Sequence, residues 1–140
     1  MHRKNFSIEG LQQFAEYLTV VNECIKYYFI KEELNPFFIY YNDEIAGFVL
    51  LNGGKYVPGD AEYSIHEIFI LKSFRGKGVA TIAIKKIFEM YKGKYKVEQL
   101  QDNKLAVKFW NGFYKKQNIV CKEEIEVIDG FNCCTQVFNI

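Results

Sequence analysis

The chain has 140 residues, of which 49% are hydrophobic and 25% are charged, and its net charge at pH 7 is +1. This composition is typical of one globular domain, and the near-neutral charge excludes the basic surface that a general nucleic-acid binder needs. No apolar stretch is long enough to cross a membrane and no signal-peptide core follows the first residues, so we expect a soluble cytoplasmic protein without nucleic-acid or membrane partners. The four cysteines and two histidines are too scattered for a zinc site, so we expect reduced thiols and no metal.

The N-terminal part of the chain predicts a short edge strand and then helix. Residues 2–7 form the expected strand. Across residues 10–31, apolar side chains recur at spacings of three and four, which indicates one amphipathic helix or two helices broken near the middle. Asn35 and Pro36 are expected to end this helical region, because the residue before a proline avoids helical backbone.

Three strands are predicted next. Residues 37–41 and 45–51 are apolar runs joined by turn-forming residues, which favours an antiparallel hairpin, and Gly47 in the second run suggests a bulge. Residues 52–63 contain glycine, proline and aspartate and are expected to form a loop. Residues 64–71 are apolar on both faces, which is typical of a central strand that is covered on both sides.

The second half of the chain predicts alternating helices and strands. A largely apolar helix over residues 79–91 precedes a strand at 95–100, and strand, helix and strand together imply a right-handed parallel crossover. A second amphipathic helix is expected over residues 103–116, with Asn103 as its N-cap.

The last two strands form a predicted hairpin. Asp129 and Gly130, a strong hairpin signal, separate the strands at 119–128 and 131–140. The whole order of elements predicts a single mixed α/β (α+β) domain over residues 1–140.

The turn at residues 75–80 carries the strongest chemical signal. It joins the expected strand at 64–71 to the helix that follows, so the free N–H groups of a helix N-terminus lie beside Arg75 and Lys77. Gly76 and Gly78 allow close backbone approach, which suits a pyrophosphate. The pattern lacks Gly-Lys-Ser/Thr and G-x-G-x-x-G, so neither a Walker P-loop nor a dinucleotide-binding turn is supported. Taken alone, it is equally compatible with an ordinary turn.

The motifs together carry a resemblance to a known family. Residues 75–80 fit the pattern Arg/Gln-x-x-Gly-x-Gly/Ala, and the later helix carries Asn103, Ala106 and Phe113-Tyr114-Lys115-Lys116. From about Phe37 to its C-terminus, the chain therefore resembles the GNAT superfamily of acetyl-CoA-dependent N-acetyltransferases. Segments 35–39, 46–50, 64–69 and 106–110 are similar to a little-characterised bacterial subgroup of that superfamily.

The resemblance implies a fold and a cosubstrate. The GNAT fold is a central mixed β-sheet flanked by helices, splayed between its fourth and fifth strands, with acetyl-CoA in the opening. One strand would pair its backbone with the pantetheine arm, residues 75–80 would wrap the pyrophosphate, and the N-cap of the later helix would face the cofactor. The residues expected to bind acetyl-CoA are Phe69, Ile70, Leu71, Arg75, Gly76, Lys77, Gly78, Val79, Ala80 and Asn103.

Glu67 is the first candidate for a general base. The implied reaction is direct attack of a neutral amine on the thioester, and a carboxylate just before the cofactor-binding stretch is placed to take the amine proton. Strand alternation would point His66 to the opposite face. The structural alternative for Glu67 is a carboxylate that caps a turn or pairs with an arginine.

The candidate proton donor to the leaving thiolate is a tyrosine of the second helix. Counting from Asn103 and Ala106, the family's tyrosine position falls on Trp110, whereas counting back from the helix end it falls on Tyr114. Trp110 and Tyr114 share a helix face, and we favour Tyr114. Packing of both residues in the core, with water as the proton donor, is the alternative.

The acceptor is expected to be a small-molecule or peptide amine. A non-catalytic GNAT-fold module that binds CoA or has a regulatory role is the alternative function. By analogy alone, the C-terminal hairpin is a candidate surface for a homodimer. Residues with side chains suited to hold an amine are Glu32, Glu33, Tyr56, Asp60, Glu62 and Tyr63.

Overall fold

The computed structural model describes residues 2–3 and 25–140. Within the predicted N-terminal strand, β1 (His2–Arg3) pairs antiparallel with β2 (Leu34–Tyr41). Most of the helix predicted over residues 10–31 lies outside the described residues. The described end of that region, η1 (Ile25–Phe29), is a 3₁₀ helix.

Asn35 and Pro36 do not end a helix, as the sequence suggested, but lie inside β2. Asn35 pairs with Leu51 and Pro36 with Leu50 of the neighbouring strand β3 (Glu44–Gly53). Among the described residues, β1 pairs with β2 only at positions 37 and 38, so none of them forms a strand pair with Pro36 on that side, which suits a residue without an N–H. The strand therefore starts three residues earlier than the apolar run at 37–41 indicated.

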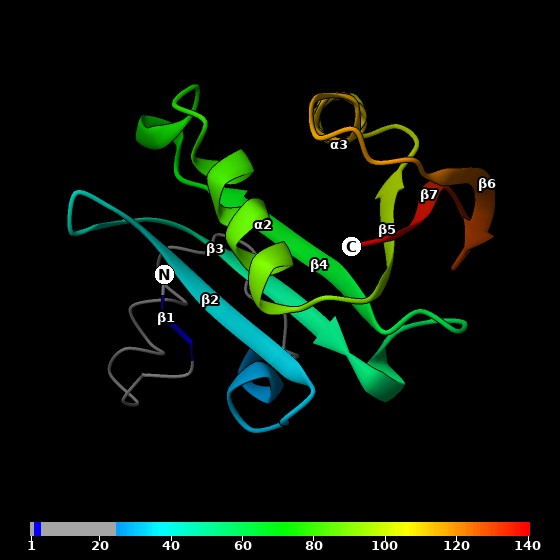
Figure 1. Cartoon of the computed structure of the whole chain (residues 1–140), viewed down its shortest axis with the longest axis horizontal. Helices are drawn as coiled ribbons and strands as arrows, with labels where there is room; N and C mark the ends of the chain where they lie inside the picture. Colours follow the sequence, from blue (N-terminus) through cyan, green and yellow to red (C-terminus); the bar gives the residue numbers. More distant parts are fainter. Residues whose placement is uncertain (1, 4–24) are drawn as a thin grey trace.

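The seven described strands form one sheet in the order β1-β2-β3-β4-β5-β7-β6. Its remaining strands are β4 (Tyr63–Ile70), β5 (Lys94–Leu100), β6 (Lys122–Ile128) and β7 (Phe131–Asn139). The β4–β5 pair is parallel and the other neighbours are antiparallel. The predicted mixed sheet and the predicted C-terminal hairpin are both confirmed (Figure 1).

The sheet opens between β4 and β5. These two strands share one register pair, Tyr63 with Tyr95, at the start of each strand, and then diverge. Figure 1 shows β4 running under α2 while β5 rises toward α3. The splay expected between the fourth and fifth strands is therefore present.

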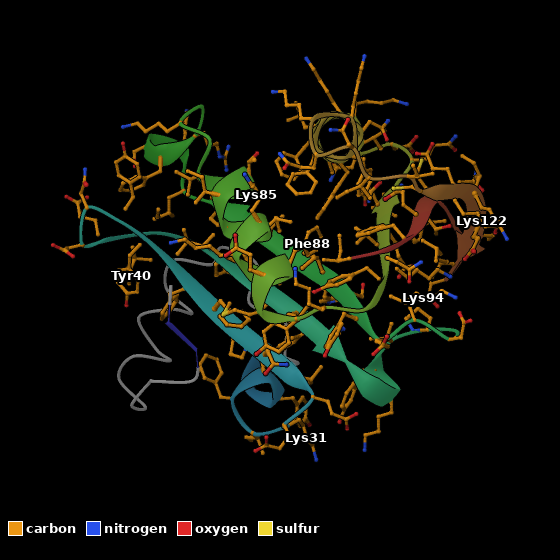
Figure 2. All side chains as sticks on the ribbon, viewed as in Figure 1. Lys31, Tyr40, Lys85, Phe88, Lys94 and Lys122 are labelled. Carbon is orange, nitrogen blue, oxygen red and sulfur yellow. The ribbon has the colours of Figure 1, made fainter. Side chains whose placement is uncertain are left out.

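Two helices lie on one face of the sheet. They are α2 (Val79–Met90) and α3 (Lys104–Lys116), and both contribute to one apolar core with the strands. Phe88 of α2 lies between the helix and the sheet, with its ring centroid 4.7 Å from that of Tyr95 and 5.7 Å from that of Phe138 (Figure 2). Asn103 caps α3 as predicted, since its side-chain oxygen accepts a hydrogen bond from the N–H of Ala106.

A second apolar cluster covers part of the other face. Tyr28, Leu34, Phe38, Phe48 and Leu50 are its buried members, and Phe69 packs against it. Ile65 of β4 belongs to the core under α2, so β4 contacts apolar residues on both faces, as a central strand should.

Two irregularities interrupt the strand ladders. The β2–β3 register shifts between Ile39 and Tyr40, which leaves an extra residue, Ala46, next to Gly47. A Cβ atom at Gly47 would overlap the carbonyl oxygen of Phe69, so this position requires glycine because the β4 backbone approaches closely. The β3–β4 register shifts between Leu50 and Leu51, which leaves His66 as the extra residue in β4.

Three further properties of the described residues bear on function. None of the described helices has the length and apolar character needed to span a membrane. The three described cysteines, Cys121, Cys133 and Cys134, are free thiols. Within the described ranges, histidine, cysteine, aspartate and glutamate side chains do not gather in a group that would hold a metal ion.

Candidate functional site

The glycine turn before α2 presents unpaired backbone N–H groups. Gly76 and Gly78 have left-handed backbone, with φ of +77° and +74°, and Gly78 is the N-cap of α2 without a side-chain acceptor. The N–H of Ile82 donates to the carbonyl of Gly78, 3.1 Å away, and begins the helical ladder. The N–H groups of the preceding helical residues, from Val79 onward, therefore have no partner in the helix and form a site of positive potential.

A hollow of about 270 Å³ adjoins this turn. Four parts of the chain meet there: the end of β4, the turn, the first turn of α2 and the middle of α3. Its lining residues are Ile70, Phe74, Arg75, Gly76, Gly78, Val79, Ala80, Thr81 and Phe109. Five of the residues predicted from the motif at 75–80 thus line one hollow, together with Ile70.

The two cations of the turn point in different directions. Arg75 donates from Nε to the carbonyl oxygen of Ile70 at 2.9 Å, and its guanidinium lies 5.7 Å from the centre of the Phe69 ring. Lys77 instead places its Nζ 5.3 Å from the ring centre of Tyr41, at the end of β2. Arg75 therefore ties the turn to the strand end at the hollow, while Lys77 extends away from it toward β2.

The edge of β4 that faces the splay carries main-chain groups that are not paired with a neighbouring described strand. The N–H of Leu71 donates to the carbonyl oxygen of Ala46, 2.7 Å away. This bond shows that Gly47 and Ile70, which are register partners, form a non-hydrogen-bonded pair of the antiparallel ladder. Ile70 therefore turns its N–H and C=O toward the opening, where its carbonyl oxygen accepts the hydrogen bond from Arg75 Nε. Alternation gives Ile68 the same orientation. Phe69 uses its main chain in the β3 ladder. Of Phe69, Ile70 and Leu71, which the resemblance implies would pair with the pantetheine arm, Ile70 presents its backbone to the opening. Ile68, which was not among the predicted residues, has the same orientation.

Asn103 and Phe109 show how α3 contributes. The Asn103 side-chain oxygen is occupied by the cap, at 3.2 Å from the Ala106 nitrogen. Phe109, two turns further along, reaches the hollow beside the glycine turn. Phe109 belongs to the apolar face of α3, which also supplies core residues such as Phe113, so the sequence alone does not indicate its place at the hollow.

Glu67 and His66 lie on the same face of β4. Glu67 is the register partner of Leu50, and Leu50 and His66 line one hollow of about 400 Å³ on the face opposite α2. The expectation that strand alternation separates His66 from Glu67 is therefore wrong, because the bulge at His66 cancels one step of the alternation. His66 stacks against Tyr28, with ring centroids 6.2 Å apart.

The Glu67 side chain is exposed rather than buried among its apolar neighbours. Within the described part of the chain it makes neither a hydrogen bond nor an ion pair, so the pairing with an arginine that we considered is not found. An unpaired carboxylate on β4, the strand that borders the opening toward β5, is chemically able to accept a proton.

Tyr114 lies in the core under α3. Its hydroxyl donates to Oε1 of Gln136 at 3.1 Å, and the side-chain amides of Gln99 and Gln136 exchange two hydrogen bonds of 2.7 and 2.9 Å. Burial raises the pKa of Tyr114 well above its ordinary value, so the hydroxyl stays protonated. Trp110 stacks on Tyr114 at 5.7 Å, on the same helix face as predicted.

The residues considered for the acceptor are mostly engaged in local structure. Asp60 forms an ion pair of 2.8 Å with Lys94, and a carboxylate oxygen of Glu62 accepts from the Lys94 N–H. Glu33 accepts from the N–H of Lys55. Among these candidates, Tyr56 lines the 400 Å³ hollow beside His66.

Comparison with protein families agrees with this geometry. The family model described as the Acetyltransferase (GNAT) family matches residues 3–113. Since the match covers most of the chain, the protein belongs to the GNAT acetyltransferase family. A search of curated proteins finds no match to the chain.

Solved structures share the fold at low sequence identity. A protein of Bacteroides thetaiotaomicron assigned to the GNAT family is 12% identical, with a TM-score of 0.68, over 100% of this chain and 88% of that one. NAA60 of Arabidopsis thaliana, solved with acetyl-CoA, is 15% identical, with a TM-score of 0.62, over 94% and 92%. A GNAT acetyltransferase of Elizabethkingia anophelis with acetyl-CoA bound is 15% identical, with a TM-score of 0.58, over 86% and 84%. These likenesses establish the fold.

Proposed function

We propose that this protein transfers the acetyl group of acetyl-CoA to an amine acceptor by direct attack. The observation that carries the proposal is the junction at Ile70, where the free edge of β4 meets the glycine turn at the start of α2. A strand edge with free amides and a helix N-terminus suit the two chemically different parts of CoA, an amide-containing arm and a pyrophosphate.

The pyrophosphate would lie in the hollow at the turn. Backbone N–H groups of residues 76–80 and the positive end of α2 suit a dianion, and Arg75 adds cationic charge at the hollow. Lys77, which contacts the Tyr41 ring, would have to turn toward the hollow to contribute its charge. Gly76 and Gly78 have open space where a Cβ would stand, so the phosphates can approach the backbone. Asn103, at the start of α3, would face the cofactor from the other side of the opening.

The pantetheine arm would run along the free edge of β4. Phe69, Ile70 and Leu71 border this edge, and Ile70 and Ile68 direct main-chain groups toward it. Glu67 is three residues from Ile70, roughly 10 Å along a strand. An extended arm anchored at the turn would therefore carry its thioester toward Glu67.

Glu67 would act as the general base. At neutral pH, deprotonating a lysine-like amine costs roughly 4–5 kcal/mol, so a carboxylate that accepts this proton, directly or through water, assists the reaction. The amine lone pair forms the C–N bond to the thioester carbonyl carbon, and the amine proton passes to Glu67. The C–S bond then breaks and releases the thiolate of CoA.

Tyr114 would return a proton to the thiolate. Its hydroxyl is protonated but donates to Gln136, so it must leave that hydrogen bond before it can serve the thiolate. This engagement is the observation that favours the alternative function, a GNAT-fold module that binds CoA without turnover.

An acetylation assay with a broad panel of amines, read by mass spectrometry, separates the two functions. Acetyl transfer to at least one amine, with release of CoA, is the expected result. Binding of acetyl-CoA without transfer to any member of the panel would favour the non-catalytic module.

A further inference from the structure

The hollow beside His66 adjoins the position proposed for the reacting amine. It has a volume of about 400 Å³ and lies on the face of the sheet opposite α2. This volume is within the range of small-molecule sites. Leu50, which lines the hollow, is the register partner of Glu67, so the proposed general base lies at its border. The chemistry of the hollow therefore bears on which amine the protein accepts.

The walls of this hollow are mostly aromatic and aliphatic. The described side chains that provide them are Tyr27, Tyr28, Leu34, Leu50, Tyr56 and His66. The rings of Tyr28 and His66 stack with their centroids 6.2 Å apart, and the Tyr28 hydroxyl donates to Oδ1 of Asn52. Such walls favour a flat apolar ligand body, because it can contact several rings at once.

The charges around the hollow differ between its two ends. The hollow follows β3 from Leu50, opposite Glu67, toward Tyr56 in η2 (Gly54–Tyr56), just after the end of that strand. The exposed carboxylate of Glu67 attracts an ammonium group at one end. At the other end, Nζ of Lys55 lies 5.4 Å from the centre of the Tyr56 ring. The described residues that line the hollow include Lys31 (Figure 2) and no carboxylate, so a second ammonium group would find no acidic partner there.

We propose that this hollow binds the acceptor, and that the acceptor is a monoamine with an aromatic body, its amine at Glu67 and its ring against Tyr56 and His66. The inference rests on the proposed acetyl transfer. Burial of the ring supplies binding energy away from the reacting nitrogen, which favours an aromatic amine over a short aliphatic one. A diamine would bring a second, unpaired charge into an apolar site, which is costly.

The transfer step is the same for every amine that reaches Glu67. The neutral nitrogen forms the C–N bond to the acetyl carbonyl carbon, and its proton passes to the Glu67 carboxylate. The C–S bond breaks, and its electron pair leaves with the CoA thiolate. The hollow thus selects the acceptor by its body, while the reacting atoms remain the same.

The test measures kcat/KM for acetyl transfer to phenylpropylamine, propylamine and cadaverine. The first two amines differ only in the phenyl ring, and the third carries a second amine. Wild type is compared with Tyr56→Ala, Tyr56→Phe and Tyr40→Ala. The last variant is a matched control, because it removes an exposed tyrosine of β2 that does not line the hollow. Saturation-transfer NMR follows binding of phenylpropylamine without acetyl-CoA, and circular dichroism confirms that each variant is folded.

Wild type should prefer phenylpropylamine to either other amine by about tenfold or more, as expected for burial of a phenyl ring. Tyr56→Ala should reduce this preference about threefold or more and weaken the saturation transfer, because one ring contact is lost. Tyr56→Phe keeps the ring and should retain both effects, as should Tyr40→Ala. The KM for acetyl-CoA should be the same in all four proteins.

Three results with active protein would overturn the acceptor assignment and leave the proposed function intact. They are equal kcat/KM for phenylpropylamine and propylamine, a preference for cadaverine, and an unchanged preference in Tyr56→Ala. Absence of acetyl transfer to phenylpropylamine, with or without saturation transfer, would also overturn the assignment. The broad amine panel then decides separately whether the protein is an acetyltransferase.

Discussion

The hydroxyl of Tyr114 donates to the side-chain oxygen of Gln136, 3.1 Å away, across the interface between α3 and β7. Gln136 is fully buried, and its amide also exchanges hydrogen bonds with Gln99. The residue proposed as proton donor is thus also part of a buried polar cluster, so catalysis and stability are both expected to depend on it.

Tyr114→Phe tests both roles. We expect kcat to fall about a hundredfold, the low end for loss of an acid catalyst, with the KM for acetyl-CoA unchanged. The free energy of unfolding should fall by about 1 kcal/mol from loss of one hydrogen bond, since Gln136 keeps its bonds to Gln99. Urea denaturation and steady-state kinetics measure the two effects. If stability falls but kcat does not change, Tyr114 is a core residue and the proton comes from elsewhere.

Glu67→Gln is expected to lower turnover while acetyl-CoA binding stays unchanged. The glutamine side chain has nearly the same shape but cannot accept the amine proton, so kcat should fall about a hundredfold, the low end for loss of a general base. Glu89→Gln, which changes an exposed carboxylate on α2, is the matched control. Equal kcat values for Glu67→Gln and wild type would assign Glu67 to structure.

Gly47→Ala is expected to destabilise the protein, because the added Cβ would displace the β4 backbone at Phe69. The cost should be about 1–3 kcal/mol, as for overpacking of a tight site. Gly53→Ala in the same strand is the control, since its Cβ would stand 3.4 Å from the nearest atom and has only a modest adjustment to make. Thermal melts measure both variants. Equal melting temperatures for the two would contradict the close approach of β3 and β4.

The features that the sequence predicted correctly depend on local chemistry. The two glycines that precede α2, the Asn103 cap and the Asp129–Gly130 hairpin each follow from a few adjacent residues. The apolar runs indicated the strands. The start of β2 was missed because asparagine and proline, at positions 35 and 36, have low strand propensity. The splay between β4 and β5 was predicted from the resemblance to the GNAT superfamily and from no local pattern.

The features that were missed depend on pairing between distant strands. The bulge at His66 is visible only in the register of β4 against β3, and it decides that His66 and Glu67 share a face. The bond from Tyr114 to Gln136 joins residues 22 positions apart. Neither residue type nor spacing indicates such a contact before the strand order is known.

The most direct test of the account is isothermal titration of acetyl-CoA into wild type, Gly78→Glu and Gly59→Glu. Both glycines have left-handed backbone, with φ of +74° and +73°, and open space around them, so the two substitutions carry similar strain. Only Gly78→Glu places a carboxylate at the N-terminus of α2, where it would repel and obstruct a pyrophosphate.

We predict submillimolar binding by wild type and by Gly59→Glu, and a loss of at least tenfold in affinity for Gly78→Glu, about 1.4 kcal/mol or more. Absence of binding by wild type, or equal affinity of the two variants, would contradict the assignment of the glycine turn to acetyl-CoA.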